Sequence, residues 1–558
     1  MTGHAPAQLS PADRLDSWKE IASYLRRDVR TVQRWEKKEG LPVYRHQHDK
    51  LGSVYSYKSE LDTWFNTRQQ SSENLQQASG TPAPSEKIKI AVLPFGNLNA
   101  DPEQDYFSDG LTEEMITQIT RLQPKSLAVI ALSTAMDYKS SNKPLTQIKE
   151  ELGIDFLLQG RVRRAEDRVR ITAQLVSLED QTQLWAETYE RNLRDILAVQ
   201  AEIAQAIAQE IQIAISRPEQ ARLDELEAGR SRLSPTAYEN YLRGRYHLHG
   251  MSATAIQKSI GHFEDAVAEE PNYAPAYAGL ASAYALLSIA PFDLLPPREA
   301  MPKAEAAAAR SLSLDDSLAE AHAALALVRH HFHWDWENAE ASYRRSIELN
   351  PDSADAHLWY SWMLLALGRR EECFREIEQT LTIVQQTDPH RLVAVHATRA
   401  MAYYFGREYQ RAVEECKKAR ELDPGHFMLR FIFGRAYARL GMKAEAIAEL
   451  QPKGTSFGDV PLADAALGLA YGMSGQTDLT QKIVEAFSSY VKTRYIPATY
   501  FGILHAGLGN PEQALQWLEK AYEERADGLT WLNVEPMLDP LRSDPRFQKL
   551  IRQIGLVK

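Results

Sequence analysis

The sequence of 558 residues has two cysteines, Cys373 and Cys416, and no long apolar run. Two cysteines cannot build a disulfide framework, so they fit a reducing compartment and small core-facing positions. No apolar stretch approaches the roughly 18 residues that span a bilayer. The first residues, "MTGHAPAQLSPADR", lack the apolar core of a secretion signal. These absences argue against a disulfide-rich secreted protein and a transmembrane protein, and they predict a cytoplasmic protein without a membrane partner.

Motifs for catalysis and metal binding are also missing. The sequence has no phosphate-loop glycine motif, no nucleophile elbow and no zinc-protease helix motif. His330, His331 and His333 are clustered, but no cysteine or acidic partner stands at the spacing of a metal site. The strand end "VLPFGN" precedes a helix start where an anion could dock, although a structural turn is the simpler interpretation. We therefore expect no enzyme activity, no cofactor and no metal.

Charge is unevenly distributed along the chain. The net charge is -11, yet nine Lys and Arg residues stand against five acidic residues between Lys19 and Lys50. This segment carries +4, so the remainder of the chain carries -15. An acidic body repels nucleic acid, so any attraction to nucleic acid must be concentrated in the basic segment.

Composition divides the chain into blocks, so the predicted fold is multidomain. Residues 1–68 form the basic first block. Residues 69–86 are rich in Ser, Gln and Pro, with little to bury, and this composition is typical of a flexible linker. Residues 87–217 mix short apolar runs with helical patterns, and residues 234–558 form a repeat array with a C-terminal cap.

The first block contains the elements of a winged helix-turn-helix in order. "WKEIASYL" and "VRTVQRW" carry apolar stripes that allow two short helices to share a core, and "YRHQHDKLGSVYSY" fits a hairpin. From Trp18 to Phe65 the sequence resembles the winged helix-turn-helix DNA-binding domain of the MerR and excisionase type. The resemblance implies double-stranded DNA as a partner. MerR activators continue into a dimerisation helix, whereas a linker follows here, so a homodimer is an open possibility.

The second helix and the wing of this block supply the predicted DNA-binding residues. Arginine pairs with guanine edges and glutamine with adenine in the major groove, and further basic side chains hold phosphates. A solvated basic face and a protein-binding helix-turn-helix are the alternatives. The predicted DNA contacts are Arg26, Arg27, Arg30, Thr31, Gln33, Arg34, Lys37, Lys38, Arg45 and Lys50.

The second block, residues 87–217, has the pattern of an α/β domain with a mixed sheet. "IKIAVLPF" and "SLAVIAL" suit buried strands, and "FLLQGRVRRAEDRVRITAQLV" alternates on both sides of a turn, as a hairpin does. "DGLTEEMITQITRL" has helical spacing, with Asp109 as the predicted N-cap and Glu113 and Glu114 in the first turn. A long amphipathic helix is expected over residues 196–215. The block resembles the TolB-like amino-terminal domain, which implies architecture more than activity.

The third block repeats with a period near 34 residues. Apolar helices end at five glycines spaced 38, 35, 34 and 34 residues apart, and prolines close several of the repeats. Paired helices with this period are the tetratricopeptide pattern, and stacked pairs form an all-α solenoid with a curved groove. The five glycines are Gly368, Gly406, Gly441, Gly475 and Gly509.

Aromatic and arginine residues on the first helices of these repeats predict a peptide groove. Such side chains anchor bound peptides, although aromatic residues are equally common as packing units between repeats. A protein or peptide is therefore an expected partner. The predicted groove residues are Tyr360, Arg399, Tyr403, Arg435 and Tyr437.

These features together predict a DNA-binding transcriptional regulator without enzyme activity. Its TolB-like domain and tetratricopeptide array are expected to receive a protein or peptide signal. Two alternatives are left open: an interaction scaffold without specific DNA binding, and a small-ligand sensor acting through the TolB-like domain.

Overall fold

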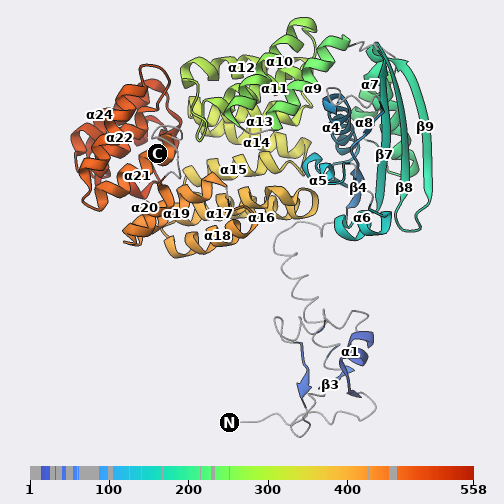
Figure 1. Cartoon of the computed structure of the whole chain (residues 1–558), viewed down its shortest axis with the longest axis horizontal. Helices are drawn as coiled ribbons and strands as arrows, with labels where there is room; N and C mark the ends of the chain where they lie inside the picture. The colour runs from blue at the N-terminus through green and yellow to red at the C-terminus, as the bar shows by residue number, and fades with distance from the viewer. Residues whose placement is uncertain are drawn as a thin grey trace. The chain divides into compact units, whose positions relative to one another are not determined.

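The chain forms two compact units in the computed structural model, Met1–Glu86 and Lys87–Lys558, and each is described by itself (Figure 1). Described within them are residues 14–24, 32, 41–45, 54–58, 61, 87–98, 105–124, 126–139, 141, 143–165, 167–213, 215, 217–227, 233–249, 252–424, 426–451 and 461–557.

The first unit combines a short helix with a small antiparallel sheet. Helix α1 (Trp18–Tyr24) is followed by the hairpin strands β2 (Tyr44–Arg45) and β3 (Val54–Tyr57). Strand β1 (Arg14–Leu15) pairs with the other edge of β3, giving the order β1-β3-β2. The pairing of β2 with β3 confirms the predicted hairpin strands.

A small apolar core holds this unit together. Ile21 and Ala22 of α1 are buried, as the apolar stripe predicted. The second helix and the wing tip fall outside the described residues, apart from Val32, which is buried in the same core. A helix-and-hairpin core is thus shown, and the complete winged helix-turn-helix stays a prediction. The core residues are Leu15, Ile21, Ala22, Val32, Leu41, Val54 and Leu61.

The second unit begins with a mixed sheet, which confirms the predicted α/β layer. Its strand order is β6-β4-β7-β8-β9, and β5 also pairs with β7. Strand β4 runs parallel to β6 and β7, whereas β7, β8 and β9 are antiparallel. The strands are β4 (Ile88–Val92), β5 (Gly96–Asn97), β6 (Leu127–Val129), β7 (Phe156–Ala165), β8 (Arg168–Ser177) and β9 (Gln183–Asn192).

Helices cover both faces of this sheet, because side chains of a strand alternate between its faces. Ile90 and Val92 share a core with α4 and α7, while Ala91 joins a second core with α6 on the other face. Gly153 ends α6 with a φ of 60°, a left-handed backbone that glycine adopts readily. The helices are α4 (Asp105–Leu122), α5 (Leu132–Met136), α6 (Leu145–Leu152), α7 (Ile196–Glu210) and α8 (Arg217–Glu227).

Two helix boundaries differ from the sequence predictions. Helix α4 begins at Asp105, so Asp109 is not its N-cap and Glu113 and Glu114 do not lie in its first turn. The extra turn buries Phe107, whose ring packs edge-on against Tyr238 at 6.3 Å between centroids. Tertiary burial therefore outweighs the local capping signal. Helix α7 ends at Glu210 rather than at residue 215.

The remaining chain is a stack of antiparallel helix pairs, which confirms the predicted all-α solenoid (Figure 1). Consecutive helices pack as pairs, and the first helices of successive pairs also contact one another. The helices are α9 (Pro235–His249), α10 (Ala253–Glu269), α11 (Ala274–Leu287), α12 (Pro297–Leu314), α13 (Ala319–Val328), α14 (Trp336–Leu349), α15 (Ala354–Ala366), α16 (Arg370–Thr387), α17 (Leu392–Phe405), α18 (Tyr409–Leu422), α19 (Phe427–Arg439), α20 (Lys443–Leu450), α21 (Pro461–Met473), α22 (Thr477–Tyr490), α23 (Ala498–Gly507) and α24 (Pro511–Glu524).

The chain after α24 folds back onto the array. We call residues 525–541 the return segment; it contains the 3-10 helices η6 (Asp527–Trp531) and η7 (Pro536–Leu541). Helix α25 (Pro545–Gln553) follows and packs on α24. The carbonyl of Ile554 then accepts a hydrogen bond of 2.7 Å from the Trp336 indole of α14. The predicted C-terminal cap region thus reaches the middle of the array as well as its end.

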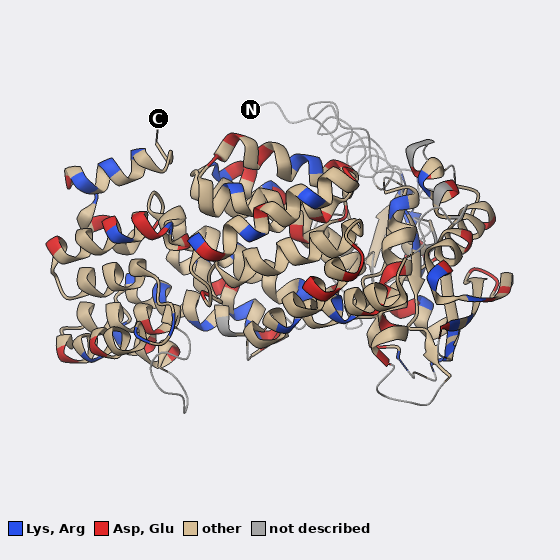
Figure 2. Cartoon of the chain, turned by 90° about the horizontal axis from the view of Figure 1, so that it is seen from above, with Lys and Arg blue, Asp and Glu red and all other residues tan. Residues whose placement is uncertain are grey.

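Charges of both signs are interleaved on the helices of the second unit (Figure 2). Lys and Arg positions alternate with Asp and Glu positions along the repeat helices in that view. Within the described part of the chain, no helix is both long enough and apolar enough to cross a membrane.

Candidate functional site

The predicted DNA-binding residues lie almost entirely outside the described residues. Arg45 is the exception, and its backbone lies in β2, paired with Val54 of β3. The DNA contacts of the other nine residues, including contacts to base edges, stay predictions. In the described core, the hairpin of β2 and β3 packs together with α1.

The predicted groove arginines have different surroundings. Arg399 of α17 donates to Glu415 of α18 at 2.8 Å and to Glu378 of α16 at 2.9 Å. It therefore bridges neighbouring helices of the stack. Arg435 of α19 is 5% exposed and forms a buried ion pair with Glu535 of the return segment.

Two of the three predicted groove tyrosines pack between helices, and the third packs on its own helix. Tyr360 is buried and donates its hydroxyl to Glu340 of α14 at 2.7 Å. Tyr403 packs on Phe374 of α16 with 5.1 Å between ring centroids. Tyr437 stacks at 5.6 Å on Phe433, one turn earlier in its own helix. These contacts belong to the packing alternative that the sequence left open, and they leave peptide binding at these positions a prediction.

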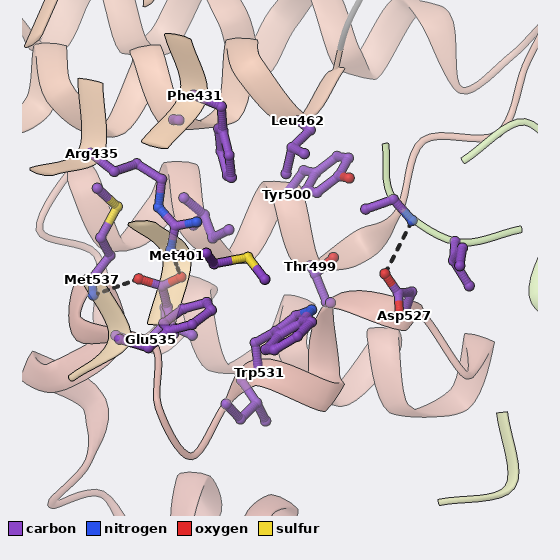
Figure 3. A pocket seen from close by; sticks show the side chains of 18 of the residues that line it. Met401, Phe431, Arg435, Leu462, Thr499, Tyr500, Asp527, Trp531, Glu535 and Met537 are labelled. Carbon is purple, nitrogen blue, oxygen red and sulfur yellow. Dashed lines mark hydrogen bonds and ion pairs between the residues drawn. The ribbon is translucent and has the colours of Figure 1, made fainter. Parts of the chain in front are cut away.

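The return segment is anchored to the array through Glu535 (Figure 3). Its carboxylate pairs with Arg435, accepts the Tyr404 hydroxyl at 2.8 Å and accepts the backbone N–H of Met537 at 3.0 Å. The Arg435 guanidinium also lies 4.5 Å from the ring centre of Phe431. A buried, multiply hydrogen-bonded ion pair of this kind is costly to break from one side.

The inner surface that the return segment covers is formed by residues that the sequence analysis did not select. Met401 and Phe405 of α17 line it together with Phe431 of α19, and Trp531 of the return segment stacks on Phe405 at 5.2 Å. Met401 follows Arg399 by two positions, which is about 200° around a helix. The signal that could have found this face is the apolar i, i+4 spacing of Met401 and Phe405.

We call the mixed sheet with helices α4 to α8 the sheet layer, and the helix pairs from α9 onward the array. A buried cluster of charges joins α4 of the sheet layer to α9 of the array. Glu113 accepts hydrogen bonds of 2.7 Å from Arg245 and from His249, and Glu114 accepts the Tyr241 hydroxyl at 2.7 Å. Burial opposes ionisation of Glu113, but Arg245 and His249 outweigh it and lower its pKa to about 2. Burial raises the pKa of Glu114 to about 7, against the weaker effect of Arg245.

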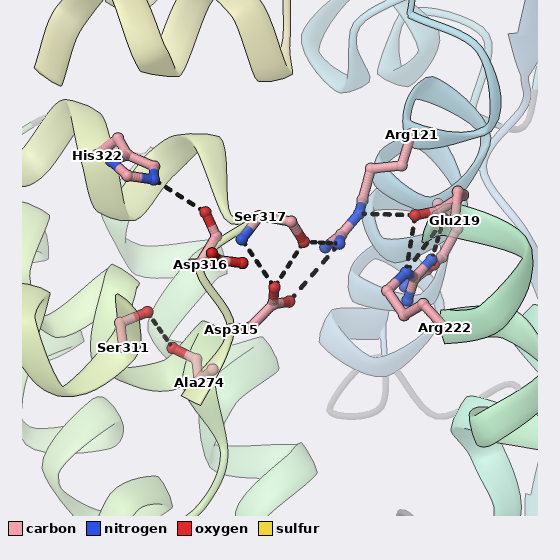
Figure 4. Close-up of polar contacts among 10 residues, drawn as sticks. Arg121, Glu219, Arg222, Ala274, Ser311, Asp315, Asp316, Ser317 and His322 are labelled. Carbon is pink, nitrogen blue, oxygen red and sulfur yellow. Dashed lines mark hydrogen bonds and ion pairs between the residues drawn. The ribbon is translucent and has the colours of Figure 1, made fainter. Parts of the chain in front are cut away.

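A second polar network joins the layer to the loop between α12 and α13 (Figure 4). Arg121 at the end of α4 donates to Ser317 at 2.7 Å and lies 3.6 Å from Asp315. Arg121 also lies 3.7 Å from Glu219 of α8, which accepts from Arg222 at 3.0 Å. Salt bridges of this kind fix orientation more than they add stability.

Further contacts join the layer to the helices α14 to α17. Lys87, at the start of the unit, binds Asp352 of the array at 2.6 Å. Ser133 of α5 donates to Asp388 at 2.6 Å in the turn before α17. Together with the two networks, these contacts hold the layer along the first half of the array as one compact body.

The helix start that the sequence marked as a possible anion site already holds carboxylates of the chain itself. Asp105 begins α4 and accepts from Asn97 at 3.0 Å. Lys139 lies 2.8 Å from Asp109 and 3.2 Å from Asp105. The local cation is therefore paired, which favours the structural interpretation of this turn.

Both cysteines are buried, in agreement with the core-facing positions expected from the sequence. Burial raises the pKa of the Cys373 thiol to about 12, so it is poorly reactive at neutral pH. In the described part of the chain, no three His, Cys, Asp or Glu side chains converge as metal ligands.

The sheet layer matches a known family. Residues 85–206 match the family model described as "HilA/YgeH-like transcriptional regulator, second domain". The chain thus holds a HilA-like transcriptional-regulator domain where the sequence resembled a TolB-like domain, and the TolB-like assignment stays a prediction.

Two curated relatives share part of the sequence. "Putative adenylate cyclase 3" of Rhizobium meliloti is 35% identical over 194 residues, which are 35% of this chain and 32% of that protein. "Transcriptional regulator HilA" of Salmonella typhimurium is 28% identical over 164 residues, 29% of this chain and 28% of that protein. The chain therefore spans about a third or less of each relative.

Solved structures similar to the chain include repeat proteins. A tetratricopeptide protein of Thermus thermophilus covers 35% of the chain with 16% identity and a TM-score of 0.30. PilF of Pseudomonas aeruginosa covers 39% with 16% identity and the same TM-score. The assignment of the array as a helical solenoid rests on its own helix pairs.

Proposed function

We propose that the chain is a DNA-binding transcriptional regulator without enzyme activity, located in the cytoplasm. The observation that carries this proposal is the match of residues 85–206 to the second domain of HilA/YgeH-like transcriptional regulators. A basic segment with +4 charge precedes this domain in a chain that is otherwise acidic. The first block binds double-stranded DNA through its second helix and wing, as the resemblance to MerR and excisionase domains implies.

The array is the receiving part of this regulator. Stacked helix pairs present long surfaces that bind proteins or peptides. Its inner surface between α17 and α21 is covered by the return segment, so a protein partner binds the uncovered surfaces of the repeats. The sheet layer is fixed along the array by buried Glu113 and by Lys87, so a partner held by the array is also held near the HilA-like domain.

The relative named as an adenylate cyclase supports the same role for the shared part. The match covers 32% of that protein. We propose that the shared segment is a regulatory module, which different proteins join to different output domains. In this chain the output is DNA binding by the first block.

DNA binding by the full chain tests the proposal. We expect anisotropy of labelled duplex DNA to show salt-dependent binding, with each phosphate-contacting Lys or Arg adding roughly 0.9 to the slope of log K against log salt. Arg34→Ala should change sequence preference, because arginine in the second helix reads bases, whereas Lys38→Ala should weaken all sequences alike.

The control for these variants is Arg552→Ala, an exposed basic residue of α25. It should bind DNA as the unaltered chain does. Absence of binding at low salt, with a normal unfolding curve, would overturn the regulator and favour the scaffold alternative.

A further inference from the structure

The return segment and the array enclose an apolar cavity of about 120 Å³. Its walls come from the first helices α15, α17, α19, α21 and α23 of the repeats, from α24 and from the residues that follow α11 and α13. The return segment supplies the rest. Met401 lies on α17, Phe431 on α19 and Leu462 and Ala466 on α21, while Trp531 closes the cavity from the return segment (Figure 3). Residues about 130 positions apart in sequence thus meet around one space, and the return segment is needed to complete it.

The charged groups at the edge of this cavity are already paired with one another. Arg435 binds Glu535, and Asp527 binds the His331 ring and accepts the backbone N–H of Ala290 at 3.1 Å. A charged ligand would have to displace one of these buried partners and leave a buried charge unpaired. The cavity therefore favours a neutral molecule.

The size and lining of the cavity define the class of ligand further. An apolar cavity of about 150 Å³ in another protein stays dry and binds benzene. Aromatic rings on the walls favour contact with a second ring. Methionine side chains adapt to the shape of what they enclose, and Met401 supplies one such wall here.

We propose that this cavity is a binding site for a neutral, apolar ring of about the size of benzene or toluene. Because the ligand contacts both the array and Trp531, its binding holds the return segment against the inner surface. The site is distinct from the DNA-binding block and from the surfaces proposed for a protein partner. It gives the array an input from a small molecule.

Binding of toluene to the full chain, measured by isothermal titration, tests this proposal. We expect saturable binding at one site per chain. Ala466→Leu places three more carbon atoms in the cavity and should weaken toluene binding at least tenfold. Ala444→Leu makes the same change on the exposed face of α20 and should bind toluene as the unaltered chain does.

Hydrogen exchange tests the effect on the return segment. Toluene should slow amide exchange of residues 527–541 in the unaltered chain and in Ala444→Leu, but not in Ala466→Leu. If circular dichroism shows that Ala466→Leu does not fold, Leu462→Phe serves as the filling variant. No saturable binding up to the solubility of toluene, or equal binding by the filled variant, would overturn the site. Unchanged exchange despite binding would overturn its effect on the segment. DNA binding is measured separately, so failure here leaves the regulator proposal intact.

Discussion

At the scale of single residues, the neighbouring carboxylates Glu113 and Glu114 have opposite environments. Glu113 binds the Arg245 guanidinium and the His249 ring, and these partners keep it ionised in the interior. Glu114 has one neutral partner, the Tyr241 hydroxyl, and burial raises its pKa to about 7. Two buried acids on one helix therefore respond to pH in opposite directions.

Replacing Glu114 by Gln should remove a pH dependence of stability. The folded chain holds a proton on Glu114 between pH 4.5, the ordinary value, and about 7, whereas the unfolded chain releases it. Stability contributed by this group is therefore present below pH 4.5 and is lost as pH rises to 7. Between pH 4.5 and 7, the free energy of unfolding of Glu114→Gln should therefore rise by about 3 kcal/mol relative to that of the unaltered chain. Urea unfolding at pH 5 and pH 8 measures the difference.

The control for this prediction is Glu150→Gln, on the exposed side of α6. Its stability should change with pH in parallel with the unaltered chain. If Glu114→Gln also runs parallel to the unaltered chain, then Glu114 is ionised in the folded state and the proposed protonation is wrong.

At the scale of elements, glycines end the first helices of the repeats through left-handed backbone. Gly441 and Gly475 take φ values of 79° and 78°, which L side chains adopt at a cost. Gly406 departs from this pattern, because its φ is -75° and the left-handed position falls on Arg407 at 63°. A Cβ at Gly406 would instead displace the flexible end of the Arg370 side chain and would lie 3.2 Å from the Ala402 carbonyl oxygen. The same sequence signal thus has two physical causes.

Two glycine substitutions should have opposite effects on stability. Gly475→Ala forces an L residue into left-handed backbone and should cost about 1–2 kcal/mol, although no atom obstructs the new methyl group. Gly261→Ala lies on the exposed face of helix α10, again without obstruction, and should stabilise the fold by about 0.5–1 kcal/mol. Thermal unfolding of both variants measures the two shifts. Equal shifts of the melting temperature with the same sign in both variants would show that left-handed backbone does not set the cost at Gly475.

Most elements could be predicted because their signals are local. Alternating apolar residues predicted β7 and β8, and glycine spacing predicted the repeat helices. The return segment had no such signal, because Glu535 binds Arg435 across 100 residues. The sequence also did not reveal the inner face of the array. Arg399 and Met401 lie on different sides of α17, and which side faces inward depends on how successive helix pairs stack. The DNA-binding residues, apart from the backbone of Arg45, lie outside the described residues and rest on the sequence alone.

At the scale of the whole molecule, the sheet layer and the array share one apolar core. Met115 of α4 and Ile203 of α7 belong to the same buried cluster as Phe263 of α10 and Tyr284 of α11. A continuous core of this kind stabilises the contact far more than its surface ion pairs do. We therefore expect the layer and the array to stay together without a covalent connection.

Cleavage between the layer and the array tests this expectation. With a specific protease site inserted between residues 229 and 230, the two fragments should elute together in size-exclusion chromatography and separate only in denaturant. Arg245→Glu places a third carboxylate beside Glu113 and Glu114 and should release the fragments from each other, because a buried charge without a partner costs several kcal/mol. Lys258→Glu makes the same charge change on the exposed face of α10 and should leave them associated. Separate elution of the unaltered fragments would mean that the chain connection, and not the shared core, holds the HilA-like domain on the repeats.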